Sequence, residues 1–169
     1  VKFKGSWYTR LFDKLVLRTH TEFGFLGAFN NDRGVIPFDR FFLGGDGMSQ
    51  YAMDGRETIS LRGYPNQSLS TQDGSTIYNR FSLELRYPIT LKPAASIFGL
   101  TFLETGQGYN SFREFNPFNG KRSLGLGLRI FMPAFGLLGI DFGYGLDAVN
   151  DFDLTPNGWE THFVIGQQF

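Results

Sequence analysis

The chain has 169 residues, and its 16 basic side chains balance 16 acidic ones. A chain with no net charge and no basic tract lacks the positive surface that a nucleic-acid binder needs, so nucleic acid is not an expected partner. The absence of cysteine excludes disulfides, thiolate metal sites and a cysteine nucleophile.

Seven segments alternate apolar and polar residues, the spacing that places successive side chains on opposite faces of a strand. In most of them one face is apolar and suited to lipid, and the other face carries charged residues and glycine. The segment from Ser96 to Thr105 is ambiguous, and its two faces stay unassigned. In chain order the segments are Val1 to Leu11, Leu15 to Phe29, Asn79 to Ile89, Ser96 to Thr105, Ser123 to Met132, Leu138 to Asp147 and Trp159 to Phe169.

The links between these segments alternate between short and long. Short links lie near residues 12–14, 90–95 and 133–136, and long ones span 30–78, 106–121 and 148–158. A soluble β-sandwich also alternates along its strands, but short turns opposite long loops are typical of outer-membrane barrels. No stretch approaches the roughly 20 apolar residues of a membrane helix. The predicted fold class is therefore an all-β, antiparallel transmembrane β-barrel.

Seven strands would leave two edges with unpaired backbone groups, which hydrocarbon does not tolerate. A lumen wide enough for the long loop of residues 30–78 also needs more strands than these. We therefore expect residues 1–169 to be the C-terminal part of a larger barrel of about 16 strands. The remainder of that barrel would pair with both edges of the sheet.

Three motifs carry a resemblance to a known family. The run from Pro37 to Gly45, with its double glycine Gly44-Gly45, and the later Leu61-Arg62-Gly63-Tyr64 together resemble the characteristic loop of the outer-membrane insertase and transporter superfamily. The glycine-rich stretch from Arg122 to Leu137 is similar to a hairpin motif of the same family. The third motif is the alternating strand that ends on Phe169. Three motifs in the right order are much more specific than one, although residues 46–58 form an extra stretch.

The resemblance implies that the loop enters the lumen with Arg62 at its tip. A guanidinium stays charged and, when buried, needs carboxylates or several carbonyls. Gly63 would supply backbone freedom, and Tyr64 would anchor against the wall. The alternative is a solvent-exposed turn with a surface arginine. Candidate partners of Arg62 are Asp141, Glu84, Glu22 and Glu104.

A stripe of glycines should face inward on the two strands that follow residue 122. Small residues there would leave room for the inserted loop, or would serve only the curvature of the sheet; the sequence leaves both explanations open. The stripe consists of Gly125, Gly127, Gly139, Gly143 and Gly145.

The family resemblance implies an insertase of the bacterial outer membrane that opens a lateral seam and lets client strands add to the exposed edge. The terminal strand, with Phe163, Ile165, Gly166 and Phe169, would form one side of that seam, and Gly166 would weaken its pairing. Expected partners are outer-membrane lipid, unfolded outer-membrane client proteins and accessory lipoproteins. A two-partner-secretion-type transporter of the same superfamily, or an ordinary porin or receptor barrel, is the alternative.

No catalytic constellation is evident. His20 and His162 are the only histidines, and neither metal binding nor general-base chemistry has a converging set of ligands or a nucleophile. The prediction is a protein that is not an enzyme, with no cofactor and no metal.

Overall fold

The computed structural model describes residues 1–27, 39–47, 57–71, 73–92, 94–150 and 154–166. Within these ranges the chain forms nine strands in two sheets, and no helix is long and apolar enough to cross a membrane. The strands are β1 (Lys2–Phe12), β2 (Leu15–Phe25), β3 (Phe41–Leu43), β4 (Glu57–Ile59), β5 (Ile77–Lys92), β6 (Ala95–Tyr109), β7 (Lys121–Met132), β8 (Gly136–Gly145) and β9 (Gly158–Gly166).

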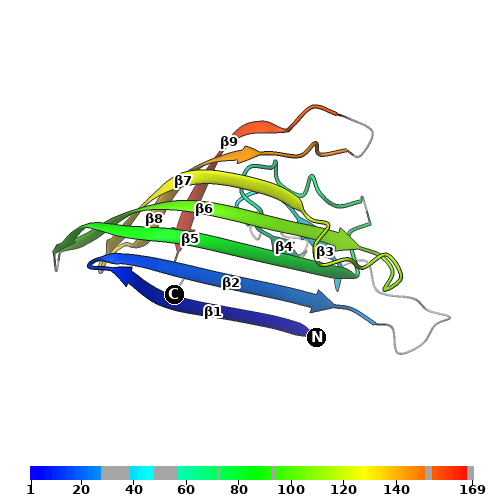
Figure 1. Ribbon diagram of the computed structural model, residues 1–169, viewed down its shortest axis with the longest axis horizontal. Helices are drawn as coiled ribbons and strands as arrows, with labels where there is room; N and C mark the ends of the chain where they lie inside the picture. Colours follow the sequence, from blue (N-terminus) through cyan, green and yellow to red (C-terminus); the bar gives the residue numbers. More distant parts are fainter. Residues whose placement is uncertain (28–38, 48–56, 72, 93, 151–153, 167–169) are drawn as a thin grey trace.

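The main sheet has seven strands in the order β1-β2-β5-β6-β7-β8-β9, and every neighbouring pair is antiparallel. It curls into a trough, as Figure 1 shows. Among the described residues β1 pairs only with β2 and β9 only with β8, so the sheet has two open edges. The predicted seven-stranded, antiparallel all-β fold is confirmed.

The two faces of the sheet differ as the alternating pattern predicts. Apolar side chains such as Leu83 and Leu126 are exposed on the convex face, whereas Ser82 and Ser123 are buried on the concave face. The structure also assigns the ambiguous strand, since Phe102 is buried and its neighbour Leu103 is half exposed. The face of β6 that carries Phe102 therefore turns inward with the polar faces of the other strands.

Short and long connections lie at opposite ends of the sheet. Tight links join β1 to β2, β5 to β6 and β7 to β8, and we call this the short-turn end. The connections after β2, β6 and β8 are long and define the long-loop end. The strands reach further than the sequence pattern indicated at β5 and β6, and β2 ends at Phe25 rather than at Phe29. Residues 28–29, 37–38 and 167–169, which include Phe29, Pro37 and Phe169, lie outside the described part of the chain.

The described part of the connection between β2 and β5, residues 39–47, 57–71 and 73–76, packs on the concave face. Its strands β3 and β4 form a small parallel sheet, which lies behind the ends of β5 and β6 in Figure 1. Phe41 of β3 meets Tyr78 of β5 edge to face, with ring centroids 4.6 Å apart. Around this contact lies a buried cluster of Phe41, Leu43, Ile59, Leu61, Tyr64, Leu69 and Tyr78. Burial of these apolar side chains fastens the connection to the sheet.

Candidate functional site: an arginine clasped on the concave face

The segment after β4 delivers Arg62 to the concave face of the sheet. Gly45 and Leu61 form an isolated antiparallel bridge, and the Gly44 N–H donates to the Ile59 carbonyl at 3.0 Å. Both glycines have positive φ, 116° for Gly44 and 84° for Gly45, which favours glycine. The double glycine thus braces the backbone that leads to Arg62.

Three carboxylates bond the buried guanidinium of Arg62. Its Nη2 donates to Glu104 at 2.5 Å and to Glu84 at 2.7 Å, and its Nη1 donates to Asp141 at 3.3 Å. The backbone N–H of Arg62 donates to the second oxygen of Glu104 at 3.0 Å. The guanidinium carbon also lies 3.7 Å from the centroid of the Phe102 ring, a cation–π contact. Strands β5, β6 and β8 therefore all hold this one side chain.

The electrostatics of the site keep Arg62 charged. Burial by itself lowers the pKa of the guanidinium, but the negative charges of Glu104 and Glu84 outweigh that effect and hold the pKa above its ordinary value. Removal of one member of such a buried set leaves the charges of the others less well compensated.

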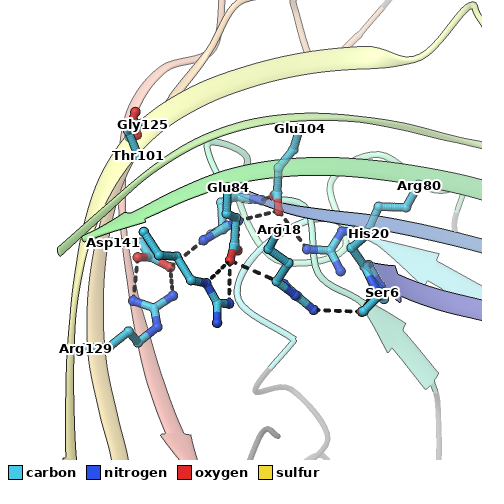
Figure 2. Close-up of polar contacts among 12 residues, drawn as sticks. Ser6, Arg18, His20, Arg80, Glu84, Thr101, Glu104, Gly125, Arg129 and Asp141 are labelled. Atoms are coloured by element: carbon cyan, nitrogen blue, oxygen red, sulfur yellow. Dashed lines mark hydrogen bonds and ion pairs between the residues drawn. The ribbon is translucent and has the colours of Figure 1, made fainter. Parts of the chain in front are cut away.

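Each of these carboxylates is also held by an arginine of the sheet. Arg80 bonds Glu104 at 2.8 Å, Arg86 bonds Glu84 at 2.5 Å, and Arg129 bonds both oxygens of Asp141 at 2.6 Å. Figure 2 shows the carboxylates of Glu84, Glu104 and Asp141 gathered in front of the sheet, with Arg129 against Asp141. We call these residues together with Arg62 the arginine–carboxylate cluster. The wall arginines hold the acids in position for the loop.

The alternating pattern puts Arg80, Arg86 and Arg129 on the charged faces of their segments, but it did not identify them as partners of the acids. The signal was present in the strand register, because Arg80 lies opposite Gly106, two residues from Glu104, and Arg129 lies opposite Gly139, two residues from Asp141. Diagonal neighbours on one face of a sheet are within reach of long side chains.

Glu22 takes part in a different contact. It accepts a hydrogen bond from the Tyr78 hydroxyl at 2.7 Å and pairs with Lys4 at 2.6 Å. No bond joins it to Arg62 among the described residues, so the structure brings together three of the four candidate acids. Glu22 lies near the long-loop end of β2, where it supports the Tyr78 side chain beneath β3.

Gly63 ties the loop to the strand at the far edge of the sheet. Its N–H donates to Nε2 of His162 on β9 at 2.8 Å, and its carbonyl accepts from the Asn157 side chain at 2.9 Å. Its φ is 88°, and a Cβ there would lie 2.9 Å from the Ser123 Cβ. Gly63 therefore meets both a conformational and a steric demand for glycine. His162, which sequence reasoning considered only as a metal ligand or base, is instead an acceptor for the loop.

Tyr64 completes the attachment. Burial raises the pKa of its hydroxyl to about 12, so the group stays protonated and donates to the Arg122 carbonyl at 2.6 Å. The same oxygen accepts from the Asp147 N–H at 3.3 Å. Arg62, Gly63 and Tyr64 thus contact five strands of the sheet, β5 to β9, or the residues directly following them.

The glycine stripe divides into two parts. A Cβ built on Gly143 would lie 2.6 Å from the Gly63 nitrogen, and one on Gly145 would lie 2.5 Å from the Gly63 oxygen. These two glycines make room for the loop. The other three make room for side chains of the wall: Phe102 beside Gly125, Asp141 beside Gly127 and Arg129 beside Gly139. The explanation by loop insertion therefore applies to Gly143 and Gly145, and packing within the wall accounts for the rest.

The terminal strand is exposed on its outer face. Phe163 and Ile165 of β9 point away from the concave side, and Gly166 has a φ of 134° with open space around it. Between the loop and the sheet lies a polar hollow of about 770 Å³, lined by residues that include Arg18, His20 and His162. Among the described residues no group of three histidine, cysteine or acidic side chains is arranged to hold a metal ion.

The bond between Gly63 and His162 leads to a prediction. In a His162→Phe variant the buried N–H of Gly63 loses its acceptor, which should cost about 1–3 kcal/mol. We expect faster hydrogen exchange at residues 61–64 in the variant, measured by mass spectrometry. His162→Gln, which retains an acceptor, is the matched control. Equal protection in the Phe variant and the wild type would show that the contact does not hold the loop.

The features described define a class of protein: a curved antiparallel sheet with an apolar convex face and a loop clasped on its concave face by buried charge. The sequence pattern of the Omp85 superfamily domain matches residues 1–169, and the chain belongs to this superfamily of outer-membrane insertase and transporter barrels. A comparison with curated proteins finds no match. The family resemblance is thereby confirmed over the whole chain.

Membership answers several questions of function. Omp85 proteins are non-enzymatic barrels that reside in outer membranes, so the chain is an outer-membrane protein and not an enzyme. Membership also implies the membrane and client proteins as partners in general. An ordinary porin is no longer an alternative.

Proposed function

We propose that this chain belongs to an outer-membrane insertase of the BamA kind, which folds client β-barrels into a bacterial outer membrane together with accessory lipoproteins. In this proposal residues 1–169 are the C-terminal part of a barrel of about 16 strands. The trough is then a section of the wall, and its concave face lines the lumen. Residues 30–78 are the loop that enters the lumen. The two open edges of the sheet support this assignment.

The observation that carries the proposal is the attachment of the loop to the terminal strand. Gly63 bonds His162 of β9 at 2.8 Å, while the neighbouring Arg62 is fixed to β5, β6 and β8 by three carboxylates. The loop therefore bridges the body of the wall and the strand beside its open edge. In the proposed mechanism this bridge holds β9 in its closed position.

The open edge of β9 supplies the insertion chemistry, which is backbone hydrogen bonding alone. An extended client segment adds to an unpaired strand edge through main-chain N–H and C=O groups. Hydrocarbon gives those groups no other partners, so pairing at the edge lowers the cost of placing a strand in the membrane. In this mechanism Phe163 and Ile165 face lipid and Gly166 lets the strand end bend away. No nucleotide is required.

A two-partner-secretion-type transporter of the same superfamily is the second candidate. In that function the lumen is the path of the client and the loop is its plug. The polar hollow of about 770 Å³ beside the loop favours this candidate, because it is lined by charged side chains from several strands. The tie between Gly63 and β9 favours the insertase.

A seam lock separates the two candidates. We expect a disulfide between β9 and the first strand of the full-length barrel to stop the insertion of many client barrels, scored as loss of their heat-resistant folded forms in outer-membrane fractions. Reduction should restore insertion, and the two single-cysteine variants are the controls. Loss of export of one client, with other barrels assembled normally, would identify a transporter. Normal assembly and normal export in the locked protein would overturn the seam mechanism.

A further inference from the structure

The connection between β6 and β7 lies on the convex face of the sheet, opposite the clasped loop. We call residues 110–120 the outer flap; Figure 1 shows this segment doubling back beside the ends of β5 and β6. Its position follows from the strand register. Asn79 of β5 lies opposite Phe23 of β2, on the face away from Glu22, and its side chain donates to the Pro117 carbonyl at 2.9 Å.

Burial confirms that the outer flap covers this part of the convex face. Leu83 and Leu103, further along the same face, are 43% and 50% exposed. Ile77 and Asn79 are only 1% and 0% exposed, although they belong to the same outward set. The covered area therefore begins where the bare apolar surface ends.

Aromatic rings and hydrogen bonds seat the outer flap. Phe25 of β2 stacks on Phe112 with ring centroids 5.7 Å apart, and Tyr109 meets Phe115 edge to face at 5.4 Å. The Tyr109 hydroxyl donates to the Asn116 carbonyl. The Asn116 side chain accepts from the Phe118 N–H at 3.1 Å. The flap is thus built from bonds to the outer surface and from turns of its own.

The seated flap presents large apolar rings to its surroundings. Phe118 is 94% exposed and Phe112 is 68% exposed, and the charged residues Arg113 and Glu114 lie between them. Exposed rings next to charged groups suit a boundary between an apolar medium and water. Together the two rings extend the apolar surface of the convex face at its long-loop end, and contiguous exposed apolar surface marks an interaction or membrane site.

The neighbouring convex surface identifies that boundary. On β2 and β5 the aromatic pair Phe23 and Phe81, with ring centroids 5.4 Å apart, lies between the exposed apolar surface around Leu83 and the outer flap. On the same convex face, near the opposite edge of the sheet, Tyr144 and Trp159 form a similar pair at the long-loop end of β8 and β9. Aromatic girdles flank the lipid-facing band of outer-membrane barrels at both interfaces. The flap continues the girdle where Asn79 interrupts the apolar face.

We propose that the outer flap is a membrane-interface anchor: it lies against the lipid headgroups outside the barrel wall, inserts Phe118 and Phe112 at the edge of the hydrocarbon, and fixes the depth of β5 and β6 in the bilayer. The proposal rests on the outer-membrane location of the chain and does not depend on whether the full-length protein inserts or secretes its clients. Its partner is the lipid surface itself.

Spin-label depth measurement tests the anchor. The 169 residues contain no cysteine, so Phe118→Cys and Leu154→Cys each add one labelling site to this chain. Leu154 is 97% exposed in the connection between β8 and β9 and serves as the matched control at the same end of the sheet. The full-length protein is reconstituted in phospholipid vesicles, and the label's accessibility to oxygen and to a water-soluble nickel chelate is measured.

We expect the label at position 118 to show severalfold lower accessibility to nickel, and higher accessibility to oxygen, than the label at position 154. Adding Asn79→Leu, which removes the donor to Pro117, should raise the nickel accessibility at position 118. Equal nickel accessibility at the two positions in vesicles would overturn the proposal. Shielding of position 118 in intact cells but not in vesicles would overturn it too, since a protein partner would then cover the flap.

Discussion

Replacement of Arg62 by alanine is expected to release the loop from the concave face and to lower the free energy of unfolding by about 3–5 kcal/mol, the usual cost of removing one member of a buried ion pair. Unfolding in urea, followed by the heat-modifiable band shift of the folded barrel, measures the loss. In intact cells residues 57–71 should become sensitive to added protease. Arg62→Lys, which keeps one charge but cannot reach three carboxylates in a planar fork, should fall between alanine and wild type.

The structure identifies the carboxylate that suffers most from this change. Glu84 keeps Arg86 and lies 3.3 Å from Arg18, and Asp141 keeps its two bonds to Arg129. Glu104 is fully buried and keeps only Arg80 of the two guanidinium groups that it contacts. A buried carboxylate left with a single guanidinium contact is the main source of the expected instability.

Second substitutions separate this explanation from a general loss of packing. Glu104→Gln in the Arg62→Ala background should recover part of the lost stability, because it removes the least compensated of the three buried charges, while Arg80 still has Glu22 at 3.8 Å. Glu84→Gln in the same background should make the protein less stable still, since it deprives Arg86 of its partner. Identical effects of the two second changes would contradict the proposed role of Glu104, and an unchanged digestion pattern in Arg62→Ala would show that the arginine does not hold the loop.

The sheet could be predicted from the sequence because alternation is a local property. From Arg80 to Tyr87 each apolar residue follows a polar one, and this alone fixes a strand and its two faces. On β6 the pattern failed to assign the faces because Leu100 and Phe102 are apolar yet face inward, where Phe102 packs against Gly125 and the Arg62 guanidinium. Only the contacts across strands distinguish the inner face there.

The long connections were beyond the same reasoning. Strands β3 and β4 have three residues each, too few to show a period, and they exist because Phe41 and Ile59 are buried against the sheet. The position of the outer flap depends on contacts of Asn79 and Tyr109. Asn79 is only the first residue of its predicted strand, and Tyr109 lies beyond the predicted end of its strand. At the site, the three acids that bond Arg62 were among the four named from the sequence, but the choice between them depends on the register of strands far apart in the chain.

Gly143→Ala is expected to displace the loop while leaving the sheet in place. The added Cβ would lie 2.6 Å from the Gly63 nitrogen and 2.9 Å from its Cα, and backbone atoms cannot rotate aside as a side chain can. Overpacking of this kind costs about 1–3 kcal/mol. Displacement of Gly63 should also break its bond to His162 and loosen the neighbouring Arg62, so the exposure of the loop should resemble that in Arg62→Ala.

Gly99→Ala is the matched control for this change. Gly99 lies in β6 on the convex face, and a Cβ there would find its nearest atom at 3.8 Å, an ordinary contact. We expect hydrogen exchange of residues 61–64 to accelerate severalfold in Gly143→Ala and to stay at the wild-type rate in Gly99→Ala. If both variants exchange at the wild-type rate, Gly143 serves the curvature of the wall rather than the seat of the loop. If both accelerate, the loop responds to any added bulk in the sheet, and the close approach of Gly63 to Gly143 has no special part in holding it.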